Sequence, residues 1–238
     1  MKNIILIAVL ALLTGCASVP TDFGVPAKNS KIGVMLLIEP SPSHAHVGTT
    51  IFQNEVRTDA STTSFVKRFE QALSAPLAKE GFNVTHIAST PKLLEERSAL
   101  FSYLSSYVSF KGDIKAELNK VAAQAGVDYV MLVYPTPGPA WPNSAAFIEG
   151  YGLYTRCFLT SCNAFSYDYI SARIYDVKNQ STLAPMTSSF YEQKAMPHVV
   201  VPSDISDVQA SDVDKAGEMA FSSFVKVYEL MLSKARFL

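Results

Sequence analysis

Residues Ile32–Ile38 form a run of strand length without a polar or charged side chain, bounded by Lys31 and by Glu39 and Pro40. A strand with one solvated face alternates apolar and polar residues, so an unbroken apolar run is typical of a strand covered on both faces. Val127–Tyr134 is a second, largely apolar segment of this kind. Two such strands favour a sheet with helices on both sides.

Apolar residues at helical spacing follow the first strand: Phe65, Phe69, Leu73 and Leu77. This spacing predicts a helix, Gly81 is positioned to close it, and Pro76 is expected to kink or restart it. We interpret Ser41–Ser64 as a long excursion before this helix, with one candidate strand at Thr50–Val56 and a Ser/Thr cluster suited to capping the helix.

Further strands and helices are predicted after the first helix. We expect a strand at Phe82–Ile87 and then two helices. The first begins at Pro91 and bears Leu93, Leu94, Phe101, Leu104 and Val108, and the second extends from Asp113 to Gly126. A hairpin of Ala146–Phe158 and Phe165–Val177 and a strand at Thr182–Tyr191 should follow, and then a last helix with these residues on its core side: Ala216, Ala220, Phe224, Val227 and Met231. No internal repeat is present. The order predicts a single α/β domain over residues 31–238, with a mixed sheet flanked by helices.

Composition narrows the function classes. The chain has 238 residues, of which 48% are hydrophobic and 17% charged, and this excludes disorder. Its formal net charge is −1, so it lacks the positive field on which nucleic-acid binding depends. We therefore expect no nucleic-acid partner.

The amino end reads as an export signal. Lys2 is followed by the apolar run Ile4–Leu13 and by small residues before Cys16. Ten apolar residues fall well short of the roughly 20 that a membrane-spanning helix needs, so the run is typical of a cleaved signal peptide.

Leu13-Thr14-Gly15-Cys16 resembles the bacterial lipobox. The resemblance implies that residues 1–15 are removed and that Cys16 is acylated, with palmitate among its fatty acids, to give a lipoprotein anchored in the membrane. Residues 16–30 would then be a lipidated tether. Ala17 and Ser18 lack the aspartate that signals inner-membrane retention, which implies the periplasmic face of the outer membrane. The alternative is an ordinary secretory signal with an incidental cysteine.

The number of remaining cysteines then predicts a disulfide. With Cys16 lipidated, Cys157 and Cys162 remain as an even pair in an oxidising compartment. The four residues between them suffice for a hairpin tip that brings both cysteines within bonding distance. A metal or redox pair is the alternative, but it would need a nearby histidine or a two-residue spacing.

Three segments, Lys79–Val84, Ala125–Leu132 and Ala172–Val177, together with the apolar first strand, resemble the TolB amino-terminal-like fold. Envelope lipoproteins related to the curli secretion channel and to activators of peptidoglycan synthases use that fold. The resemblance extends over most of the mature chain. It implies an accessory or assembly component of an envelope complex. A pore is not implied, because the sequence has no long amphipathic transmembrane hairpin.

No constellation of catalytic residues stands out in the sequence. Serine-hydrolase elbows, phosphate-binding glycine loops, His-Glu-x-x-His motifs and dinucleotide-binding patterns are all missing. His44 and His46 would point to the same side of a strand and could share a metal ion, but His86 and His198 are distant in sequence. We favour exposed loop histidines, and expect no enzyme activity, no metal and no cofactor.

Tyr134–Pro142 is a proline-rich segment that follows an apolar strand, where open α/β sheets often bind ligands. Trp141 is the sole tryptophan, a residue type enriched in binding hot spots, and we select Trp141 and Tyr134 as candidate partner-binding residues. A loop that tucks Trp141 onto the core edge is an equal alternative. Five strand tyrosines form either a recognition face or a covered face: Tyr151, Tyr154, Tyr167, Tyr169 and Tyr175.

Three functions follow from these observations. The first is a lipid-anchored, non-enzymatic envelope lipoprotein that docks on another envelope protein through the Trp141 loop or the disulfide-tipped hairpin. The second is a periplasmic module that binds a small ligand or peptidoglycan. A hydrolase is the third, and would need an acidic residue beside His44 or His86 in a pocket.

Overall fold

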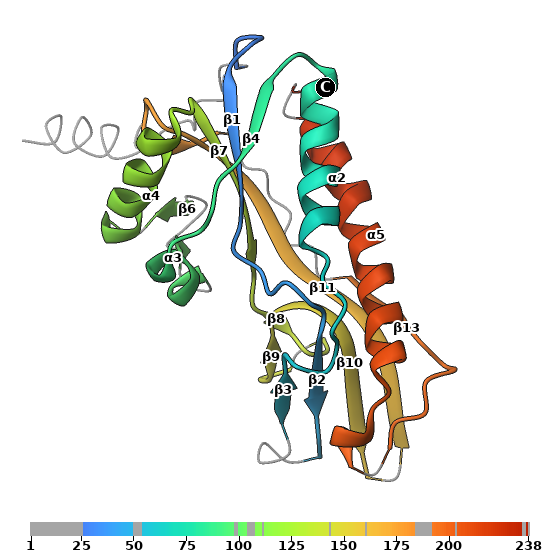
Figure 1. Cartoon of the computed structure of the whole chain (residues 1–238). Coiled ribbons are helices and arrows are strands. Elements are labelled where there is room, and N and C mark those ends of the chain that lie inside the picture. Colours follow the sequence, from blue (N-terminus) through green and yellow to red (C-terminus); the bar gives the residue numbers. More distant parts are fainter. Residues whose placement is uncertain are drawn as a thin grey trace, which may run out of the picture.

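The structure is a computed structural model, and it describes residues 26–49, 54–97, 100–103, 108–110, 112–142, 144–159, 161–183, 192–202, 204–234 and 237. Within these ranges the chain forms one large mixed sheet with helices on both sides, and two separate two-stranded sheets (Figure 1). The predicted single α/β domain is confirmed. Cys16, the leader and residues 17–25 of the predicted tether lie outside the described residues.

One long strand, β11 (Ser161–Asp176), organises the sheet. Its second half pairs antiparallel with β7 (Tyr129–Pro135), and β7 is followed outward by parallel strands β1 (Lys31–Leu36) and β4 (Asn83–His86). The predicted strands at both apolar runs are therefore present and adjacent.

The first half of β11 pairs with a second group of strands. Its hairpin partner is β10 (Gly150–Phe158), which pairs in parallel with β2 (Ser43–Val47), and β2 pairs antiparallel with β3 (Glu55–Arg57). The strand order is β3-β2-β10-β11-β7-β1-β4, and two short strands also pair with β11: β12 (Ser181–Thr182) and β13 (Glu192–Ala195).

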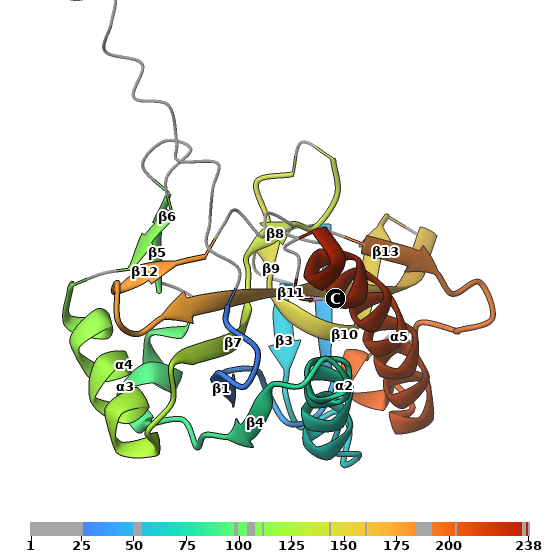
Figure 2. The ribbon, with the colours of Figure 1, turned by 90° about the horizontal axis from the view of Figure 1, so that it is seen from above.

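Helices cover the two faces separately (Figure 2). On one side lie α2 (Val66–Lys79) and α5 (Ala210–Lys234), and on the other lie α3 (Pro91–Glu95) and α4 (Gly112–Ala125). Strand β1 contributes to both cores, because Ile32 and Val34 pack with α2 and α5 whereas Met35 packs with α3 and α4. Burial on both faces explains the unbroken apolar sequence of this strand.

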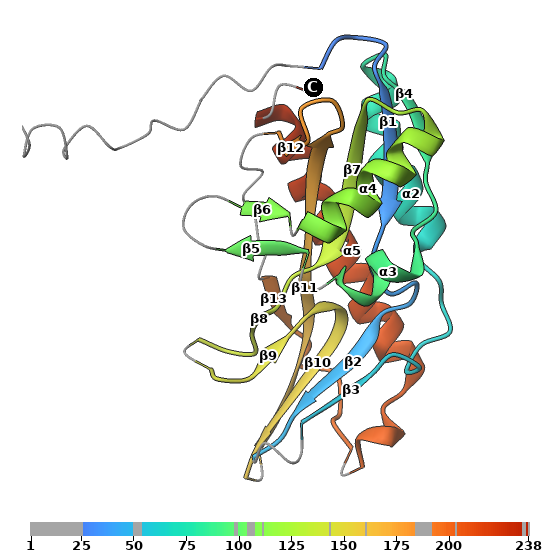
Figure 3. The same cartoon turned by 90° about the vertical axis from the view of Figure 1, so that its left-hand side faces the viewer.

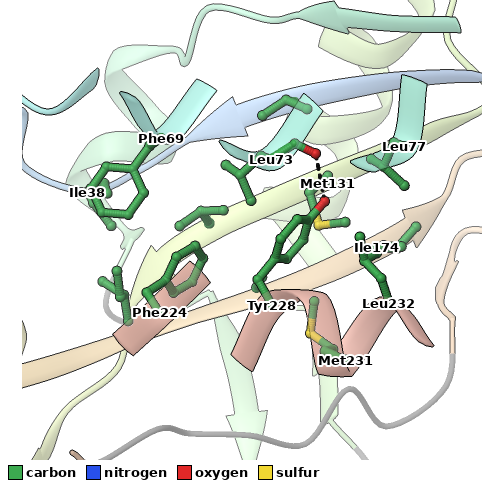
Figure 4. Close-up of a cluster of buried hydrophobic side chains, with 14 of the residues drawn as sticks. Ile38, Phe69, Leu73, Leu77, Met131, Ile174, Phe224, Tyr228, Met231 and Leu232 are labelled. Carbon is green, nitrogen blue, oxygen red and sulfur yellow. Dashed lines mark hydrogen bonds between the residues drawn. The ribbon is translucent and has the colours of Figure 1, made fainter. Parts of the chain in front are cut away.

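Figure 4 shows the core between α2 and α5. Phe69 and Leu73 of α2 meet Phe224 and Tyr228 of α5 over the sheet. The Tyr228 hydroxyl donates a hydrogen bond of 2.8 Å to the Leu73 carbonyl oxygen, so this buried polar group is satisfied inside an apolar cluster.

The predicted helix from Pro91 to Val108 is wrong beyond its first turns. Helix α3 ends at Glu95, and the following residues form β5 (Phe101–Tyr103) and β6 (Val108–Phe110), which pair antiparallel. Each strand has a serine between two aromatic or β-branched residues, and this alternation is typical of a strand and not of a helix. Leu104 lies outside the described residues.

Two further expectations need correction. The excursion predicted for Ser41–Ser64 contains β2 and β3, so it belongs to the sheet; within the candidate strand at Thr50–Val56, the described strand residues begin at Glu55. Pro76 does not restart its helix, because α2 continues through it to Lys79 and the proline lies in the last turn, where it removes a single hydrogen bond.

Smaller elements complete the description: β8 (Gly138–Pro139), β9 (Phe147–Ile148) and the 3₁₀ turn η3 (Ile205–Asp207). Residues 184–191 of the strand predicted at Thr182–Tyr191 lie outside the described residues. Among the helices that are described, none combines the length and apolar character required to cross a bilayer.

Strand β2 approaches β10 closely at Gly152, and this contact generates a stability prediction. Gly152 has φ +139°, and a Cβ there would lie 2.1 Å from the Ser43 carbonyl oxygen. Gly152→Ala should therefore lower the free energy of unfolding by about 3 kcal/mol or more, as measured by urea titration. Gly112→Ala is the matched control: its Cβ meets no atom within 4 Å, so stability should stay level or rise.

Candidate functional site

The β10–β11 hairpin extends to the end of the molecule farthest from the start of β1 (Figure 3). Cys157 faces Cys162 in the antiparallel register, and Phe158 faces Ser161 at the last pair before the turn. The two cysteines form a disulfide with their Cα atoms 4.1 Å apart. The predicted disulfide at a hairpin tip is confirmed.

Two large apolar side chains are exposed at this tip. Phe158 is 60% exposed and Leu159 is 75% exposed. Leu159 has φ +54°, a left-handed conformation that belongs to tight turns. Its backbone N–H donates to Oγ1 of Thr49, just beyond β2, at 3.2 Å, so the turn is fixed both by the disulfide and by the neighbouring strand.

Trp141 lies on the side of the hairpin from which Arg156 and Phe158 project. Its ring is half-buried against the cluster formed by Ala45, Tyr154 and their neighbours, and the Arg156 guanidinium lies 4.2 Å from the ring centroid. Arg156 and Phe158 are two residues apart on β10, so both project from one face of the sheet. We call Trp141, Arg156, Phe158 and Leu159 the distal surface. The indole both packs on the core edge and retains some exposure.

Tyr134 lies elsewhere. It is 2% exposed in the cluster beneath α3 and α4, and its hydroxyl accepts a hydrogen bond of 2.6 Å from Nε of Arg173. The two candidate partner-binding residues are therefore not brought together, and a partner could reach the Tyr134 ring only after rearrangement. The distal surface includes Trp141 alone of the two.

The five strand tyrosines are covered, as in the second of the two alternatives, but they do not share one face. Tyr151 packs toward α2 and α5, whereas Tyr154 and Tyr167 pack on the opposite side of the sheet. All are buried: Tyr151, Tyr154, Tyr167, Tyr169 and Tyr175. Four have hydroxyl partners: Tyr151 with the Glu39 carbonyl at 3.2 Å, Tyr167 with Ser43 Oγ at 2.7 Å, Tyr169 with the Pro139 carbonyl at 2.8 Å, and Tyr175 with Asn119 at 2.7 Å. Burial raises the pKa of Tyr154 to about 12. These rings belong to the core.

His44 and His46 are placed differently from the sequence-based expectation of exposed loop residues. Both lie on β2, 1% and 8% exposed, and both contact Thr155 of β10. His44 Nε2 lies 2.7 Å and His46 Nδ1 lies 2.8 Å from the Thr155 hydroxyl. The same-side geometry expected of a strand is therefore present, with a hydroxyl where the two rings converge.

The electrostatics of this pair follow from burial. Desolvation, followed by the charges of His46 and Arg57, lowers the pKa of His44 to about 4. Desolvation also lowers the pKa of His46, with Glu55 opposing the shift. No group of three or more His, Cys, Asp or Glu side chains suited to a metal occurs among the described residues. Sequence reasoning identified the pair but missed its burial and its contact with Thr155, because Thr155 is more than 100 residues away.

Comparison with known proteins gives little further information. No family model matches this chain, and no curated protein matches it. A solved structure of the hypothetical protein CT253 from Chlamydia trachomatis aligns with 87% of this chain and 95% of its own, at 8% identity and a TM-score of 0.33. This similarity is too low to support an argument about fold or function.

The disulfide yields a stability prediction. It closes a short loop, and the chain-entropy relation gives a stabilisation of about 2 kcal/mol for a loop of this length. The free energy of unfolding of Cys157→Ser/Cys162→Ser, measured by urea titration, should therefore be lower than that of the wild type by about 2 kcal/mol. Its far-ultraviolet circular dichroism should stay unchanged. Peptide mapping without reductant should recover the two cysteines in one linked fragment of the wild type. Free alkylation of both would contradict the assignment.

Proposed function

We propose that this protein is a lipid-anchored, non-enzymatic envelope lipoprotein that docks on another envelope protein through its distal surface. The lipobox-like sequence ending at Cys16 supports the anchor and the outer-membrane location. The disulfide supports an oxidising compartment, because such bonds persist mainly outside the cytosol.

The position of the distal surface supports its role. β1 begins beside the far end of β11, since Ile32 pairs with Tyr129 and Tyr129 pairs with Asp176. The hairpin tip lies at the other end of β11, about 50 Å away at 3.3 Å per residue. A lipid attached ahead of β1 would thus hold the molecule by one end and leave the tip free to meet a partner (Figure 1).

The observation that carries the proposal is the pair of exposed apolar side chains on a constrained turn. Phe158 and Leu159 lie beyond the disulfide, and no strand-forming requirement calls for an exposed leucine at a left-handed turn position. A constrained turn loses little conformational entropy on binding, which favours a preorganised docking site. The partner should offer an apolar depression.

The alternative of a ligand- or peptidoglycan-binding module depended on surface tyrosines. Those tyrosines are buried, so no specific observation favours that alternative. It enters the following experiment as a separate outcome.

Phe158→Thr/Leu159→Asn removes the apolar tip while keeping a strand former and a residue that tolerates the left-handed turn. In cells, a photo-crosslinker at Thr49, beside the tip, should give a discrete adduct with wild type, and the double variant should lose at least nine-tenths of it. The melting temperature should shift by less than about 2 °C, since both side chains are exposed.

The control is Leu230→Gln, because Leu230 is an exposed leucine on α5, away from the tip. It should retain the adduct. Equal adduct yield in the tip variant and wild type would contradict the proposal. A melting shift on adding peptidoglycan fragments, unchanged by the tip variant, would instead favour the alternative.

A further inference from the structure

The buried pair on β2 shares a single hydroxyl. Thr155 carries one hydrogen, so its oxygen can donate to one imidazole and accept from the other. The ring that accepts from Thr155 must be neutral, and a neutral second ring can donate to the same oxygen. This arrangement suits two neutral imidazoles in a place where Thr155 itself is fully buried.

This arrangement disfavours protonation of His44. Nδ1 of His44 is buried and has no hydrogen-bond partner among the residues that the structure describes, so protonation creates a charged ring with an unsatisfied N–H there. His46 is close enough for ring–ring contact, with centroids 6.4 Å apart, so two imidazolium ions would repel each other.

The charged groups around the pair come mainly from β3. Glu55 is opposite His46 and Arg57 is opposite His44 in the register, so one neighbour favours and one disfavours a proton. Arg57 is itself held by Asp59 at 3.4 Å and by the Ser206 carbonyl at 3.0 Å, with Asp204 nearby.

The remaining elements packed on this side are mostly apolar. β10 and α5 contribute Leu153, Val213 and Ala216, and Asp214 of α5 is engaged by Ser61 and Thr63. On β11, Ser166 lies opposite Leu153, and Asp168 follows on the same side. On β13, Lys194 lies opposite Ser166.

We propose that His44, His46 and Thr155 form a proton-operated latch that releases β2 and β3 from β10 at acidic pH. The latch is a conformational device, and its existence does not require the proposed docking function. β2 connects the edge strand β3 to the rest of the sheet through its pairing with β10, so its release frees the outer edge of β10. It also removes the contact between Thr49 and the turn at Leu159.

The sign of the effect follows from proton linkage. In the open state the imidazoles are hydrated and take up protons at their ordinary pKa of 6.5, whereas the closed state resists protonation until about pH 4 in the case of His44. The open state therefore gains protons as pH falls from 6.5 toward 4, and opening becomes easier. His44 alone should raise the opening constant about 20-fold between pH 7 and pH 5.

Amide hydrogen exchange tests the latch in the intact folded protein. Protection factors, which remove the intrinsic pH dependence of exchange, should fall about 20-fold for Ser43–Val47 between pH 7 and pH 5. Those of β1 and β7 should change by less than about 3-fold. An equal fall in both groups of strands, or no fall in β2, would overturn the proposal.

The matched variant is His44→Gln/His46→Asn, because glutamine and asparagine present a polar nitrogen or oxygen at the Nε2 and Nδ1 positions without titrating. It should abolish the pH dependence, and His198→Gln, which replaces an exposed histidine, should retain it. If the double variant fails to fold, the wild-type histidine proton resonances decide: a His44 pKa near 6.5 in the folded protein overturns the latch.

Discussion

The pairing of β11 with two separate groups of strands is the constraint on which the rest of the structure depends. Its second half joins β7, β1 and β4, and its first half joins β10, β2 and β3. Its two faces are also covered: Ile170, Ala172 and Ile174 pack with α2 and α5 on one side, and its tyrosines are buried on the other. Loss of this strand would separate the two groups.

The same strand relates the two ends of the molecule. The end near β1 is covered by helices, whereas the hairpin continues beyond the main helical cores and ends in a disulfide and an apolar turn. The latch on β2 lies between these ends, where the second group of strands meets α5. The proposed docking surface and the proposed pH-sensitive contact thus lie on adjacent strands, while the first group of strands packs against helices on both faces.

Sequence patterns predicted much of the fold because they report local burial. The run at Ile32–Ile38, the four-residue spacing from Phe65 and the alternation before Asp176 each follow from which side chains are covered. The predicted helix was wrongly extended beyond Glu95, because the positions of apolar residues do not distinguish a helical period of 3.6 from a strand period of 2 over so short a segment. The disulfide could be predicted because its cysteines are close in sequence.

The histidine pair could not be identified in the same way. His44 and His46 stand among prolines and serines, a composition typical of loops, and their burial depends on Thr155 and α5, which are far along the chain. Similarly, the exposure of Phe158 and Leu159 depends on their place at the end of the hairpin, where no element that the structure describes covers their side chains, and local sequence does not carry that information.

The proposed docking requires a rigid, apolar tip, and backbone ¹⁵N relaxation of the oxidised protein measures that rigidity directly. Order parameters of about 0.85 for the Phe158 and Leu159 amides, equal to those in the middle of β10, are the expected result. Values below about 0.6 at these two residues, with the disulfide intact, would contradict a preorganised tip.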